Sequence, residues 1–178
     1  MQLSLTKQFL VPADLATDEV ITSLSSCPPH GAIPPMLRVQ LIAKDEGGQR
    51  LESTDFPWIG GNLPVYSREA FEHLSPVLQA YGRPIVLRTD GDGDFVGLHL
   101  DRVIDALDYG RSRITRFASG RLMMIDEHVF VPAAVTDVWM FRLTGIPRAG
   151  WTYVSERYVD AVQQSPFRGA EFELLWRA

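Results

Sequence analysis

The stretch over residues 83–100 constrains the fold most, because it has the pattern of two strands joined by a tight turn. Residues 85–87 (Ile-Val-Leu) form a short apolar run typical of a buried strand. Residues 89–94 (Thr-Asp-Gly-Asp-Gly-Asp) supply turn residues that tolerate positive φ. In residues 96–100, three apolar side chains alternate with Gly97 and His99, which predicts a second strand with one face on a core. We therefore expect a hairpin at the centre of the fold.

The hydrophobic period changes after this hairpin. Val103, Ile104 and Leu107 share one face of a helix, and Asp101 is a suitable N-cap, so the pattern predicts a short helix over residues 101–108. Residues 112–117 then leave this helix as another extended segment.

The rest of the chain mixes strand and helix signals. Ser67 and Ser155 each precede a helical pattern and are predicted caps, and Pro76 predicts a kink or a second helix start. Alternating apolar residues predict strands over residues 37–43, 138–143 and 170–176, the last of them half-exposed. We expect an α+β fold, a single domain with a mostly antiparallel sheet and a few short helices. Residues 1–54 are expected to form a strand and loop region packed on a main domain over residues 55–178.

The composition excludes several classes of protein. Cys27 is the one cysteine among 178 residues, so neither an intrachain disulfide nor a cysteine metal cluster is expected. The net charge of −5 argues against general nucleic-acid binding, which needs a basic surface. No apolar run approaches the roughly 20 residues of a membrane span, and the first residues do not resemble a signal peptide. These features predict a cytoplasmic protein with no membrane contact.

Few residues suggest catalysis. If His99, Asp101, Glu127 and His128 met in space, they would suit a small metal-dependent or acid–base enzyme, although histidines on the polar faces of strands are a simpler explanation. Residues 90–94 copy the first five positions of a calcium loop, but Phe95 and Asp101 stand where glycine and glutamate are needed, so a hairpin turn is favoured. The sequence contains neither a phosphate-binding glycine loop nor a nucleophile elbow. We expect no catalytic residues, no metal and no cofactor, and thus a protein that is not an enzyme.

Five segments, in order and spacing, resemble a known family: residues 65–71, 96–108, 138–143, 153–159 and 169–176. They are similar to the Myxococcus-type immunity domain of bacterial polymorphic toxin systems, immunity family eleven. The likeness covers roughly residues 55–176.

The resemblance implies a protein that binds and neutralises a cognate secreted toxin or effector, such as those of type VI secretion, by stoichiometric inhibition. It brings no catalytic residues and does not identify the toxin. An effector-binding adaptor, which would bind without neutralising, is a further alternative.

Two stretches combine features of protein interfaces, in which aromatic anchors lie inside polar rims. They are the acidic turn of Asp90, Asp92 and Asp94, and the aromatic pair Trp151 and Tyr153. We predict these five residues as partner contacts. A solvated hairpin tip and a core-facing strand are the simpler interpretation.

Overall fold

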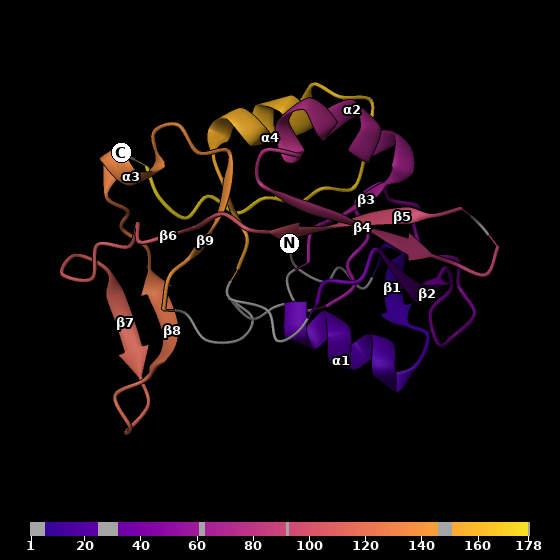
Figure 1. The fold of residues 1–178 in the computed structure, drawn as a ribbon, viewed down its shortest axis with the longest axis horizontal. Coiled ribbons are helices and arrows are strands. Elements are labelled where there is room, and N and C mark those ends of the chain that lie inside the picture. The colour runs from indigo at the N-terminus through magenta and orange to yellow at the C-terminus, as the bar shows by residue number, and fades with distance from the viewer. Residues whose placement is uncertain (1–5, 25–31, 61–62, 92, 146–150, 178) are drawn as a thin grey trace.

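A five-stranded sheet forms the centre of the computed structural model, which describes residues 6–24, 32–60, 63–91, 93–145 and 151–177 (Figure 1). Its strand order is β1-β2-β4-β5-β3. The strands are β1 (Phe9–Pro12), β2 (Met36–Ile42), β3 (Val65–Ser67), β4 (Gly82–Arg88) and β5 (Phe95–Leu100).

The predicted hairpin is confirmed as β4 and β5. They pair antiparallel from Gly82 opposite Leu100 to Leu87 opposite Phe95. The turn between them includes Gly93 at φ +94, a conformation that glycine adopts without strain. On its other side β4 pairs with β2 in parallel, whereas the β1–β2 and β3–β5 pairs are antiparallel. The predicted α+β class with a mostly antiparallel sheet is therefore confirmed.

The sheet is covered on both faces, so β5 buries the face that was predicted to lie on a core and the opposite face as well. Every residue of β5 is buried. Val96, Leu98 and Leu100 pack in the cluster that contains helices α2 (Arg68–Leu78) and α4 (Glu156–Gln163). Phe95 belongs to a second cluster with helix α1 (Leu15–Leu24). Figure 1 shows α2 and α4 above the sheet and α1 below it.

The two serine caps differ. The Ser67 side chain accepts a hydrogen bond from the Ala70 backbone amide, as predicted for the start of α2. Pro76 lies inside α2, so no second helix begins there. Ser155 has the predicted N-cap position of α4 but makes no side-chain capping bond.

A three-stranded sheet, β10-β9-β6, extends from the main sheet. It contains β6 (Val103–Ile104), β9 (Met140–Leu143) and β10 (Tyr153–Val154). The predicted helix over residues 101–108 was wrong, because Val103 and Ile104 pair in parallel with Arg142 and Leu143. The backbone hydrogen bonds of residues 103–104 thus go to a strand far along the chain.

A hairpin of β7 (Arg113–Arg116) and β8 (Leu122–Glu127) projects from the body of the molecule (Figure 1). A short helix, α3 (Pro132–Val135), follows it. A third cluster of buried side chains supports the base of the hairpin and includes Phe130, Phe141 and Tyr153.

The predicted strand over residues 170–176 was also wrong, because this segment has no regular secondary structure and joins no sheet. Its side chains instead meet different parts of the body: Phe172 lies edge-on to Tyr158, and Trp176 lies edge-on to Phe130. Lys7 donates to the Gly169 carbonyl and pairs with Glu171.

The first 54 residues contribute two strands, β1 and β2, to the main sheet, in addition to α1. Cys27 lies outside the described residues. In the part of the chain that the structure describes, no helix is both long and apolar enough to cross a membrane.

Candidate functional site

The acidic turn carries carboxylates that already have basic neighbours. Asp90 accepts a hydrogen bond from Arg38 at 3.2 Å. Asp94 accepts one from Arg68 at 3.2 Å and lies 3.6 Å from Arg88 on β4. Because three arginines surround these two carboxylates, the local charge at the described part of the turn is balanced within the chain.

Asp92, the third predicted contact in this turn, lies outside the described residues. The ion pairs of its neighbours are solvent-exposed, and such pairs contribute little to stability. The turn therefore remains free to exchange these partners for those of another protein.

The two predicted aromatic contacts have opposite environments. Trp151 is 51% exposed, whereas Tyr153 is 6% exposed. The Tyr153 ring stacks on Phe141 at a centroid distance of 5.3 Å, and its hydroxyl lies 3.1 Å from Nε2 of His128. Burial raises the pKa of Tyr153. Tyr153 is thus a core residue, and Trp151 presents the accessible ring.

The two histidines considered for acid–base chemistry lie in separate sets of neighbours. The His99 side chain is 2% exposed, and its Nε2 lies 3.6 Å from Oδ1 of Asp101. The carboxylate of Asp101 also accepts two hydrogen bonds from Arg83. Burial lowers the pKa of His99, as do the charges of Arg142 and Arg83, whereas Asp101 and the Leu24 backbone act in the opposite direction. Its Nδ1 is buried and has no partner among the described residues. The imidazole is therefore held neutral at neutral pH.

His128 is also buried, which lowers its pKa, and the charge of Glu173 opposes this shift. Its ring contacts Phe130, Trp151 and Tyr153. The adjacent Glu127 is exposed at the end of β8. In the described ranges, no hydrogen bond or ion pair joins these residues to His99 and Asp101, and no group of three His, Cys, Asp or Glu is placed to hold a metal.

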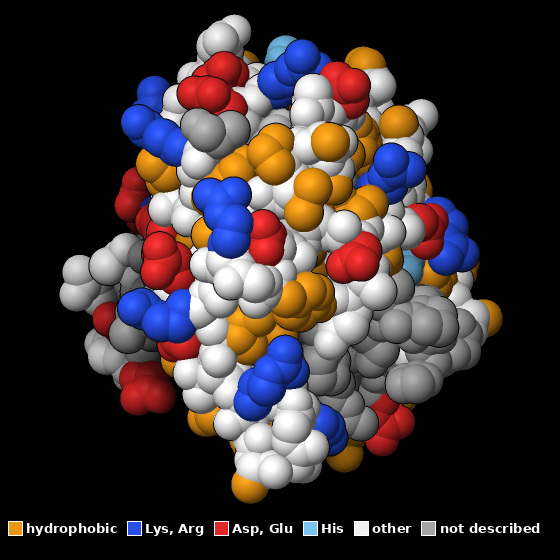
Figure 2. Space-filling view, turned by 90° about the vertical axis from the view of Figure 1, so that its left-hand side faces the viewer, with side chains coloured by type: hydrophobic (Ala, Val, Ile, Leu, Met, Phe, Trp, Pro, Cys, Tyr) orange, Lys and Arg blue, Asp and Glu red, His pale blue; other side chains and the backbone are white. Residues whose placement is uncertain are grey.

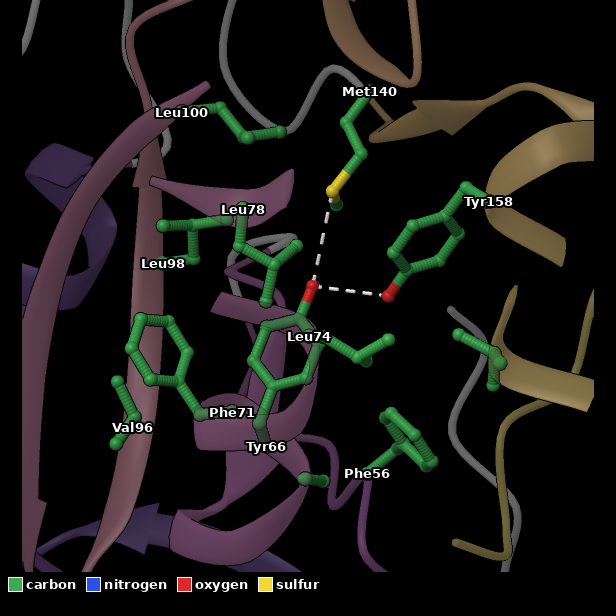
Figure 3. Close-up of a cluster of buried hydrophobic side chains, with 12 residues drawn as sticks. Phe56, Tyr66, Phe71, Leu74, Leu78, Val96, Leu98, Leu100, Met140 and Tyr158 are labelled. Carbon is green, nitrogen blue, oxygen red and sulfur yellow. Dashed lines mark hydrogen bonds between the residues drawn. The ribbon is translucent and has the colours of Figure 1, made fainter. Parts of the chain in front are cut away.

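The sequence did not reveal a buried contact that joins three of the family-like segments (Figure 3). The hydroxyl of Tyr66 lies 3.0 Å from that of Tyr158 and 3.9 Å from the sulfur of Met140. Burial raises the pKa of both tyrosines, that of Tyr158 to about 12. Leu98, from a fourth segment, belongs to the same cluster. Four of the five segments therefore each place at least one residue in this cluster, whereas other residues of the same segments, such as Phe141 and Tyr153, lie in the third cluster.

The exposed apolar side chains of the β7–β8 hairpin were also missed. Phe117, Met123 and Met124 are 46%, 56% and 53% exposed. The signal in the sequence was weak, because the hairpin over residues 113–127 mixes three arginines with Asp126 and Glu127.

The fold and these surfaces define an α+β protein with exposed aromatic and charged features. A scan against models of known protein families finds no match, and a search of curated proteins finds none either.

Proposed function

We propose that this chain is a cytoplasmic immunity protein that binds a cognate bacterial toxin and neutralises it stoichiometrically. The observation that carries the proposal is the shared core formed by the segments that resemble the immunity family. Tyr66, Leu98, Met140 and Tyr158 come from four of those segments and pack together. A core to which four of these segments contribute supports a common scaffold, and the step from scaffold to function rests on analogy.

This arrangement also separates the residues that stabilise the fold from those that can contact a partner. Residues that are buried against one another cannot contact a partner directly, so recognition of a particular toxin falls to exposed side chains. Of the predicted contacts, Trp151 is the accessible aromatic ring; it contacts the His128 ring, which in turn contacts Tyr153. An exposed tryptophan on a rigid aromatic base is a suitable interface anchor, because it buries a large area at little cost in conformational entropy.

The test is co-expression with the polypeptide encoded by the gene beside this one. We expect the chain to restore growth and to co-purify with that polypeptide in a one-to-one complex. Trp151→Ala should weaken the complex by about 2 kcal/mol or more if Trp151 is an anchor. Leu15→Ala is the matched control, because Leu15 is an even more exposed apolar side chain, at 83%, on helix α1. Full toxicity in the presence of folded wild-type protein would contradict the proposal.

The same experiment separates the alternatives. An effector-binding adaptor would co-purify with the polypeptide but leave its toxicity intact. A metal-dependent or acid–base enzyme using His99 and His128 would lose its effect on growth when both histidines are replaced by glutamine. An immunity protein would keep neutralising the toxin in that variant as long as the fold survives.

A further inference from the structure

The β7–β8 hairpin is an arm with exposed apolar side chains. Met123 and Met124 are both more than half exposed, and Met123 is the extra residue of a register shift opposite Thr115 and Arg116. Ile114 and Ile125 pair across the two strands and pack against the third buried cluster, so the base is anchored. In the described part of the chain the hairpin pairs with no further strand. Two-stranded hairpins are marginal in water alone, so an exposed one of this kind gains stability from a partner.

The end of the arm away from its base combines apolar and basic side chains. Arg116 and Arg121 flank the turn, and the guanidinium of Arg121 lies 5.7 Å from the centre of the Phe117 ring. Figure 2 shows hydrophobic side chains gathered on the side of the molecule that carries the hairpin, with basic and acidic side chains among them. Methionine is over-used at protein-binding surfaces because its flexible thioether adapts to different partners. An exposed apolar patch with a charged rim is typical of a docking surface.

The arm is slightly basic in an acidic protein. Residues 113–127 hold three arginines and two acidic residues, Asp126 and Glu127, a net charge of +1 in a protein of net charge −5. None of these three arginines forms an ion pair with a carboxylate in the described residues. The arginines around Asp90 and Asp94, in contrast, are paired. Asp126 and Glu127 lie at the base end of the arm, where Asp126 accepts a hydrogen bond from Thr115 and Glu127 pairs opposite Arg113 in the register. The arginines without a nearby acidic residue of the hairpin are therefore Arg116 and Arg121 at its tip.

We infer that the β7–β8 arm docks onto a protein partner that presents acidic side chains around an apolar site, and that this partner is the toxin. The inference rests on the proposed function and adds to it the docking surface and the charge of the partner. The apolar site would receive Phe117, Met123 and Met124, and the carboxylates would pair with Arg116 and Arg121. Trp151 lies at the base of the arm, because it packs against His128, the residue that follows β8.

Two other occupants fit the arm less well. In a second copy paired through the free edge of β7, Arg113 of one chain would face Arg116 of the other, and like charges directly opposite are destabilising. A nucleic acid would use the arginines, but it would leave two methionines against phosphate and sugar. Arginines on an edge strand also discourage aggregation, which would account for Arg113 and Arg116 on β7. That role does not explain Arg121, which lies in the turn, or Met123 and Met124 on β8.

The experiment measures binding of the polypeptide from the adjacent gene to surface-immobilised wild-type chain and variants over a range of ionic strength. Arg121→Glu should slow association by roughly tenfold at low salt and flatten its salt dependence. The matched control is Arg50→Glu, the same charge change at an exposed arginine near the end of β2, and its association rate should stay within about twofold of wild type. Met123→Ser/Met124→Ser should mainly speed dissociation, by roughly tenfold. Unchanged circular dichroism and melting would establish that the variants fold.

The outcomes separate the two proposals. If wild type binds and the arm variants behave like Arg50→Glu, the inference is wrong and the proposed function stands. If wild type does not bind that polypeptide, both are wrong. A short single-stranded DNA that binds wild type, but not Arg121→Glu, would assign the arm to nucleic acid and overturn the inference.

Discussion

Replacing the paired tyrosines with phenylalanine, singly and together, tests whether their hydroxyls stabilise the core where the family-like segments meet. Tyr66 is fully buried and Tyr158 is 4% exposed. Their hydroxyls are 3.0 Å apart, and Tyr66 has the sulfur of Met140 at 3.9 Å as a second, weak partner. Phenylalanine keeps both rings in place, so each substitution removes only a hydroxyl.

The magnitudes follow from what each substitution leaves behind. A buried polar group that loses its partner costs about 1–3 kcal/mol, whereas replacing both partners by apolar groups is nearly neutral. Tyr66→Phe isolates the Tyr158 hydroxyl, which has no other partner in the described residues, so we expect a loss of about 2 kcal/mol. Tyr158→Phe leaves Tyr66 beside Met140, so the loss should be nearer about 1 kcal/mol.

The double variant should be nearly neutral, whereas the two single losses sum to about 3 kcal/mol, so the coupling between the hydroxyls should be about 3 kcal/mol. The free energy of unfolding is measured by urea titration, followed by tryptophan fluorescence. In a domain of this size, 1 kcal/mol shifts the melting temperature by about 2–4 °C, so a thermal scan provides an independent reading. Single losses that add up in the double variant would refute the reasoning, because two hydroxyls that do not depend on each other cannot be a hydrogen-bonded pair.

Two further predictions concern pH and backbone conformation. Burial lowers the pKa of His99 below the value of 6.5 that it has in the unfolded chain. As the pH falls below 6.5, the unfolded chain therefore takes up a proton before the folded protein does. The folded protein should lose stability over the range between 6.5 and its own, lower pKa. Urea midpoints should drop between pH 7 and about pH 5.5, and His99→Gln should make that drop shallower; an equal drop in the variant would assign it to other groups. Gly169→Ala should lower the melting temperature more than Gly120→Ala. Both glycines have positive φ, but an added Cβ at Gly169 lies 2.0 Å from Oγ1 of Thr54, whereas at Gly120 it meets nothing within 4 Å. Equal melting temperatures would mean that the contact with Thr54 relaxes without cost.

The elements that the sequence predicted correctly are those whose signals are local. The β4–β5 hairpin has its turn residues and both strands within residues 82–100, and helix α2 has its cap and apolar face within residues 67–78. Neither needs knowledge of distant residues. The presence of strands and helices, and so the α+β class, follows from such segments.

The failures have distant causes. The apolar spacing of residues 103–107 fits a helix, but a parallel partner strand at Arg142 and Leu143 takes the backbone hydrogen bonds. The alternation over residues 170–176 fits a strand, yet its apolar side chains contact two different clusters, so no neighbouring strand is needed to bury them.

The predicted contact residues show the same limit. Nothing near Asp94 in the sequence indicates that Arg68, 26 residues earlier, donates to its carboxylate. The burial of Tyr153 depends on Phe141 and His128, which other segments supply. Exposure and pairing are therefore properties of the assembled fold, whereas residue type and spacing can be taken from the sequence.

The strand order has a consequence for how quickly the protein reaches its native state. The loop that joins β4 to β5 is short, because it consists of residues 89–94. The parallel partner of β4 is β2, which ends at Ile42, so β3 and α2 lie in the much longer loop between β2 and β4. Closing the longer loop costs more entropy before any contact compensates, so the hairpin forms early and β2 joins later. Substitutions in the β4–β5 hairpin should therefore slow folding, whereas equally destabilising ones in β1 or β2 should mainly accelerate unfolding. The half-life of the folded protein thus depends on the strands that join last.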